Sequence, residues 1–137
     1  MTTSPVPSGA VSDRPFWKAG LVAGVLAAVA TTAIAAIADA SGISLDVDGE
    51  PIPLPGFTTV TLGAVGVGFL LAFLSLRFTS RPRRTFVVTT VVLTVASLIP
   101  DVITPMAGNT RAILALCHLV AAAIVIPAIA SRLPEQR

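Results

Sequence analysis

The sequence predicts an all-α integral membrane protein, a four-helix bundle with both its amino and carboxyl termini inside the cell (N-in/C-in). Three observations lead to this fold class. Only 12% of the 137 residues are charged, whereas about a quarter of an ordinary soluble domain is charged, and the mean hydropathy is +0.89. Four long runs contain no Asp, Glu, Lys or Arg. The basic residues gather at those ends of the runs that would lie on one side of a membrane. Lipid is therefore the expected solvent of most apolar side chains.

The four uncharged runs have the length of membrane spans. They cover residues 19–38, 58–76, 85–100 and 112–131. A helix needs about 20 residues to cross the hydrocarbon core, so the third run reaches full length only with residues 101–104. The runs are continuously apolar and lack the alternation of barrel strands, which predicts helices. We expect one membrane domain of residues 16–133 with spans at about 17–39, 57–77, 85–104 and 111–131.

The basic residues indicate how the bundle faces. If the amino terminus is cytoplasmic, eight of the nine Lys and Arg residues, all except Arg111, lie on the cytoplasmic side. This is the positive-inside pattern of a plasma-membrane protein. Residues 1–15 are rich in Ser, Thr, Pro and Gly and predict a disordered cytoplasmic tail, and residues 134–137 a second short tail.

The first span carries small residues at a regular interval. Gly20, Gly24 and Ala28 are four residues apart, so they share a helix face that lets another helix approach closely. In a four-span chain we favour packing within the molecule over a homodimer. The apolar run is longer than the core of a signal peptide, so we expect this segment to be retained, although residues 38–40 resemble a cleavage site.

The acidic loop after the first span contains a turn signal. Asp48 and Gly49 precede three Pro at alternate positions, which predicts a tight turn or hairpin followed by an extended strip. The acids around the turn do not follow the pattern of a twelve-residue calcium loop, so we expect a solvated turn and no metal site.

The third span carries polar residues on one face. At about 100° per residue they fall within about 80° of one another. They are Thr90, Thr94, Ser97, Asp101 and Thr104. Because a carboxylate is costly in lipid, this face must turn toward the inside of the bundle.

A candidate polar cluster follows from this face and from ionisable residues toward the outer leaflet. Its members are Asp39, Asp101, Arg111, His118, Thr90, Thr94 and Ser97. One interpretation is a proton- or ligand-responsive site, with Asp101 or Asp39 paired with Arg111 and His118 beneath. A structural salt bridge that closes the outer end is an equal alternative. For His118 alone, a hydrogen bond between helices is favoured.

Four arginines mark the loop between the second and third spans. They are Arg77, Arg81, Arg83 and Arg84, candidate contacts for anionic lipid head groups. A role in topology alone is the favoured alternative. The pI near 9.5 does not indicate a nucleic-acid partner, because the basic residues sit at helix ends.

Motifs of known chemistry are missing from the sequence. It has no nucleophile elbow, Walker sequence, zinc helix or CxxC. One Cys and one His, Cys117 and His118, cannot form a tetrahedral metal site within a monomer. We therefore expect a protein that is not an enzyme and that uses no cofactor or metal.

The closing portion, SLIPD followed by NTRAILALCHLVAAAIVIPAIASRL, resembles a family of small uncharacterised four-span membrane proteins of actinobacteria. The resemblance implies the four-span fold and supplies no activity. We expect a structural or accessory protein or a sensor of the envelope, surrounded by the lipid bilayer and acting with a membrane-protein partner or as a homo-oligomer. The alternative is a small oligomeric transporter, with Asp101, Arg111 and His118 lining an outer vestibule. The first span lacks the embedded Glu of small multidrug exporters.

Overall fold

The structure is a computed structural model that describes residues 15–137. The tail expected at residues 1–15 lies, except for Pro15, outside the described residues. Four helices account for most of the described chain. They are α1 (Phe16–Ala40), α2 (Leu54–Phe78), α3 (Pro82–Ile103) and α4 (Gly108–Ala130). Each is long and apolar enough to cross a membrane, which confirms the predicted all-α fold with four such segments.

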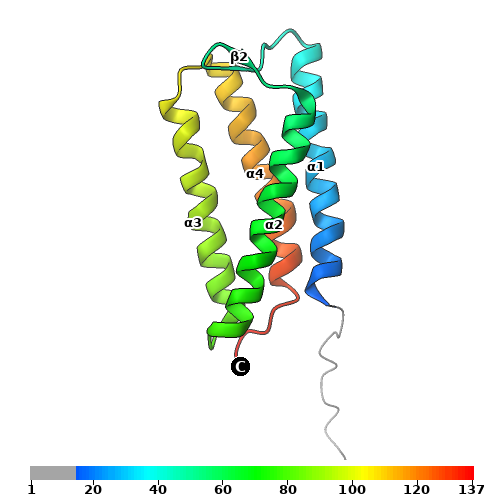
Figure 1. The fold of residues 1–137 in the computed structure, drawn as a ribbon, viewed down its shortest axis with the longest axis vertical. Coiled ribbons are helices and arrows are strands. Elements are labelled where there is room, and N and C mark those ends of the chain that lie inside the picture. Colours follow the sequence, from blue (N-terminus) through cyan, green and yellow to red (C-terminus); the bar gives the residue numbers. More distant parts are fainter. Residues whose placement is uncertain (1–14) are drawn as a thin grey trace, which may run out of the picture.

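The helices run alternately up and down, and the described chain begins and ends at the same end of the bundle (Figure 1). The helix α1 packs against α2 and α4, and α3 packs against the same two helices from the other side. The helices α2 and α4 touch each other much less. This arrangement leaves α1 and α3 at opposite corners of the bundle (Figure 1).

The small residues of α1 face its neighbours within the molecule. A Cβ atom added to Gly20 would come within 2.5 Å of Phe69 Cε1, and one added to Gly24 within 2.8 Å of Val65 Cγ1. Both distances are too short for a side chain, so glycine is what allows α2 to lie this close. The favoured interpretation of this face, packing inside one chain, agrees with the structure.

A short hairpin covers the end of the bundle opposite the carboxyl terminus (Figure 1). Strands β1 (Asp46–Val47) and β2 (Glu50–Pro51) pair antiparallel, as the sequence predicts. Asp48 and Gly49, at φ 54° and 82°, form the two-residue turn with positive φ that suits the twist of a hairpin. The extended strip is shorter than expected, because α2 already begins at Leu54.

Hydrogen bonds tie this hairpin to the rest of the bundle. The main-chain N–H of Asp48 donates to the carbonyl of Pro105, in the loop between α3 and α4, at 3.0 Å. The hydroxyl of Thr110, in the first turn of α4, donates to the carbonyl of Ser44 at 2.7 Å. Leu45 is buried beneath the hairpin in a cluster with Phe57. The segment between α1 and α2 is therefore attached to the loop between α3 and α4 and to the first turn of α4.

The last residues of the chain lie along the turn between α2 and α3. The main-chain N–H of Arg83 donates to Pro134 at 3.2 Å, and that of Arg137 donates to Ser80 at 3.0 Å. The side chains of Arg83 and Glu135 form an ion pair at 3.1 Å. Residues 134–137, expected as a tail, thus contribute to the folded end of the bundle.

Candidate functional site

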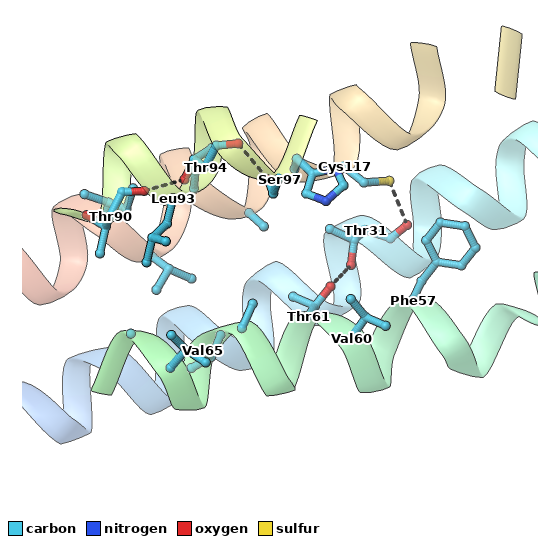
Figure 2. Close-up of a pocket in the computed structure, with 18 of the residues that line it drawn as sticks. Thr31, Phe57, Val60, Thr61, Val65, Thr90, Leu93, Thr94, Ser97 and Cys117 are labelled. Carbon is cyan, nitrogen blue, oxygen red and sulfur yellow. Dashed lines mark hydrogen bonds between the residues drawn. The ribbon is translucent and has the colours of Figure 1, made fainter. Parts of the chain in front are cut away.

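A cleft of about 620 Å³ lies between α2, α3 and α4 (Figure 2). Small side chains of two helices are among its lining residues: Ala64 and Gly68 of α2, and Ala121 and Ala122 of α4. The residues that line it come from every helix and are mostly apolar. They are Thr31, Ile52, Gly56, Phe57, Val60, Thr61, Ala64, Val65, Val67, Gly68, Leu71, Phe86, Thr90, Leu93, Thr94, Ser97, Leu114, Cys117, His118, Ala121, Ala122, Val125 and Ile126.

The cleft opens sideways from the bundle. Val60 and Val67 of α2 and Leu93 of α3 line it, yet about half or more of the surface of each is exposed. These three residues therefore rim a mouth between α2 and α3. In a bilayer the sides of the bundle meet lipid, so the mouth would face the hydrocarbon core.

Three hydroxyls of α3, the hydroxyl row, line one wall of the cleft (Figure 2). Thr90 donates to the carbonyl of Phe86 at 2.7 Å, Thr94 to that of Thr90 at 2.8 Å, and Ser97 to that of Thr94 at 2.6 Å. Each hydrogen is thus used within the helix, while the hydroxyl oxygens keep lone pairs that can accept a further bond. The predicted inward orientation of this face is confirmed, except that Thr104 lies just beyond the end of α3.

A second pair of hydroxyls lies on the α1 and α2 side of the cleft. Thr31 and Thr61 are joined by a hydrogen bond of 2.9 Å, and the thiol of Cys117 donates to the carbonyl of Thr31 at 3.7 Å (Figure 2). The sequence interpretation missed both threonines. The buried positions Phe57, Thr61 and Val65 recur every four residues along α2, and this spacing is the signal that would have found Thr61.

His118 and Asp101 meet near the end of the cleft that lies toward the hairpin. Side chains lean toward the amino end of their own helix, and α3 and α4 are antiparallel, so these two lean toward each other. Nδ1 of His118 lies 3.3 Å from Oδ2 of Asp101 and 2.8 Å from the carbonyl of Leu114. A carbonyl only accepts, so Nδ1 carries the hydrogen. Asp101 is 7% exposed, and its Oδ2 forms no hydrogen bond within residues 15–137.

Arg111 joins this pair through the main chain. Its Nε donates to the carbonyl of Asp101 at 2.6 Å, and it forms no ion pair with a carboxylate of the described chain. Arg111 bonds to this carbonyl because a carbonyl in the last turn of α3 has no partner within the helix and attracts a donor. Asp39 is exposed at the end of α1 and pairs with none of the three. The structure therefore brings Asp101, Arg111 and His118 together and leaves Asp39 apart.

The arginines of the turn between α2 and α3 lie at the opposite end of the bundle. Arg81, Arg83 and Arg84 line a second hollow, whereas Arg77 is not among its lining residues. Within residues 15–137, no group of three or more His, Cys, Asp or Glu side chains is placed to hold a metal ion. The arrangement is suited to binding an apolar molecule that carries a polar group.

Comparison with known proteins gives one match. The model of a family described as "Family of unknown function (DUF6069)" matches residues 11–135 of the chain. Neither the curated proteins nor the solved structures contain a match. The match covers all four helices, every lining residue of the cleft and all those of the second hollow except Gln136.

Proposed function

From the premise that the chain belongs to DUF6069, a family of unknown function, we propose that it is a membrane protein that binds a lipid-like molecule without transforming it. It serves as an accessory or sensor component of the cell envelope. The observation that carries this proposal is the cleft between α2, α3 and α4, which is apolar, partly open and reached from the side of the bundle.

The size and lining of the cleft support a lipid-like ligand. Its volume of about 620 Å³ falls within the range of about 300–1,000 Å³ that is typical of small-molecule sites. A water-soluble ligand would need a path through the hairpin or the carboxyl-terminal segment, which cover the two ends. An apolar molecule dissolved in the bilayer reaches the mouth between Val60 and Leu93 directly.

The polar groups of the cleft support a ligand with one polar part. The hydroxyl row runs along one wall, and His118 lines the same cleft from α4. The hydroxyl oxygens offer acceptors to a hydroxyl or amide of the ligand, while the apolar residues contact its hydrocarbon. A fatty alcohol, a free fatty acid or a prenyl alcohol has this chemistry.

Charge asymmetry supports a plasma-membrane location with the hairpin outside. The hairpin end carries Asp46, Asp48 and Glu50, while the opposite end carries the arginines of the turn between α2 and α3. The positive-inside rule then puts both termini in the cytoplasm, in keeping with the resemblance to actinobacterial four-span proteins. A protein of this kind acts through a membrane-protein partner or a second copy of itself; nucleic acid has no part in this proposal.

A small transporter is the second candidate. The convergence of Asp101, Arg111 and His118 at the outer end favours it, since ionisable residues at membrane depth often mark ion or substrate paths. This function predicts pH-dependent flux in proteoliposomes that is lost in the folded Asp101→Asn variant. Binding without flux supports the first proposal.

A photoreactive fatty acid tests the binding function. The reconstituted protein is irradiated with a diazirine-bearing fatty acid, and the attachment sites are mapped by mass spectrometry. We expect adducts to concentrate on cleft residues such as Thr94 and to be sparse on the outward face of α1. Ala122→Phe fills the cleft and lowers cleft adducts about tenfold, the equivalent of about 1.4 kcal/mol.

The neighbouring residue supplies a matched control. Ala123 is exposed and does not line the cleft, so Ala123→Phe places the same side chain on the outer surface of α4. Cleft labelling is expected to stay at the level of the unmodified protein. Adducts spread evenly over all helix faces, or equal labelling of the two variants, would contradict a binding cleft.

A further inference from the structure

A second hollow, of about 410 Å³, lies at the carboxyl-terminal end of the bundle, far from the cleft. Its walls are three arginines and two valines at the start of α3, with two residues of the carboxyl-terminal segment. They are Arg81, Arg83, Arg84, Val87, Val88, Glu135 and Gln136. We propose that this hollow binds the phosphate group of an anionic phospholipid.

The charge around the hollow is strongly positive. Three guanidinium groups surround it, and α3 begins here at Pro82 with no acidic residue in its first turn and no side-chain cap. The amino end of a helix adds a partial positive charge that attracts anions. Of the three arginines only Arg83 forms an ion pair within residues 15–137, which leaves Arg81 and Arg84 for a ligand.

The fold builds the hollow from two distant parts of the chain. Main-chain hydrogen bonds from Arg83 to Pro134 and from Arg137 to Ser80 hold the carboxyl-terminal segment against the turn between α2 and α3. This contact places Glu135 and Gln136 opposite the arginines. The site is therefore more than a basic loop, because its second wall depends on tertiary contacts.

The position of the hollow favours a phospholipid over a free phosphate ion. Val87 and Val88 belong to its lining and lie along α3 on the side that leads into the apolar part of the helix. Val88 is 54% exposed, so an uncovered apolar surface begins where the arginines end. A head-group phosphate among the arginines would leave the acyl chains against this surface. A free phosphate ion has no apolar part that could contact this surface.

Glu135 occupies part of the place that the phosphate would take. Its carboxylate contacts Arg83 at 3.1 Å, and 80% of its side chain is exposed. Exposed ion pairs contribute little to stability, so an incoming phosphate can displace this carboxylate at small cost. We infer that Glu135 weakens lipid binding and that its removal strengthens it.

Native mass spectrometry of the purified protein titrated with phosphatidylglycerol or phosphatidylcholine tests the site. We expect phosphatidylglycerol to bind more tightly than phosphatidylcholine. Arg81→Gln and Arg84→Gln should each weaken phosphatidylglycerol binding about fivefold, since a basic residue near an anionic surface contributes about 1 kcal/mol. Glu135→Gln should strengthen it by a similar factor, a gain that misfolding cannot produce.

Two comparisons decide the result. Arg77→Gln removes the same charge from the last turn of α2, at the same end of the bundle but outside the hollow, and it should leave phosphatidylglycerol binding within about twofold. Equal losses for Arg77→Gln and Arg81→Gln, or equal binding of the two lipids, would overturn the proposal. Inorganic phosphate that competes with phosphatidylglycerol at equal concentration would overturn the lipid assignment, because the apolar surface would then contribute nothing.

Discussion

The contact of α1 with α2 and the space between α2 and α4 are both rich in small residues, yet one is closed and the other open. At the first, Gly20 and Gly24 of α1 receive Phe69 and Val65, large side chains that fill the room the glycines leave. At the second, Ala64 and Gly68 of α2 and Ala121 and Ala122 of α4 line a cleft. Of the apolar stretch that could cross a membrane, 39% is buried in α1 and only 17% in α3.

This difference shows what small residues do in a membrane bundle. Association of helices in lipid depends on van der Waals packing, since lipid tails are as apolar as the side chains they would replace. A glycine strengthens that packing only where the neighbouring helix supplies a side chain to occupy the space. Where both helices offer small residues, a space can remain between them.

Enlarging a residue of the closed contact should have the largest effect on stability. In Gly24→Leu the new side chain collides with Val65, which lies 2.8 Å from the added Cβ, and we expect a loss of about 3 kcal/mol in the free energy of unfolding. Gly66→Leu is the control, because a Cβ there has no atom within 4 Å. Unfolding in mixed micelles, followed by circular dichroism, measures both. Equal losses would show that helix propensity, and not the contact, sets the effect.

Removing the imidazole of His118, near the hairpin end of the cleft, should have an intermediate effect on the free energy of unfolding. His118→Ala leaves the buried carboxylate of Asp101 without its neighbour, at a cost of about 1–2 kcal/mol. In the Asp101→Asn background the same change should cost less, since the remaining group is uncharged. The coupling free energy from this double-mutant cycle, by the same unfolding measurement, is the quantity to determine. A coupling of zero would contradict the contact.

Replacing single threonines should have the smallest effect on the free energy of unfolding. These variants should also distinguish the contact between α1 and α2 from the hydroxyl row of the cleft. Thr31→Val removes the hydrogen bond to Thr61 between α1 and α2, worth about 0.6 kcal/mol in membrane proteins. Thr94→Val removes a hydroxyl that bonds only to its own helix, so stability should hardly change. Cleft labelling by the photoreactive fatty acid, by contrast, should fall only in Thr94→Val. The reverse pattern would place the polar group of the ligand beside Thr31 and Thr61 and not at the hydroxyl row.

Features with local signals could be predicted from the sequence. Uncharged runs predict the four helices, Asp48 and Gly49 predict the hairpin turn, and the spacing from Thr90 to Asp101 predicts a face that turns inward. Each rests on residues within a few turns of one another, where helix and turn geometry alone settle the outcome.

Features that depend on distant partners could not be predicted. Charge suggests that Arg111 pairs with a carboxylate, but the free carbonyl at the end of α3 lies within its reach, and only the structure shows this. Similarly, the contact of the last residues with Ser80 and Arg83 cannot be inferred from the composition of these segments. No single residue indicates the cleft, because its volume depends on which side chains the fold brings together.

The hairpin of β1 and β2 has a consequence for how sequences of this family can diverge. Its anchor to the loop between α3 and α4 joins the amide of Asp48 to the carbonyl of Pro105, and its strands pair through main-chain atoms as well. Main-chain groups persist through almost any substitution. This loop can therefore vary in charge and surface chemistry, the properties that neighbouring molecules detect, while staying attached to the helices, provided that the residues at positions 48 and 49 tolerate a positive φ.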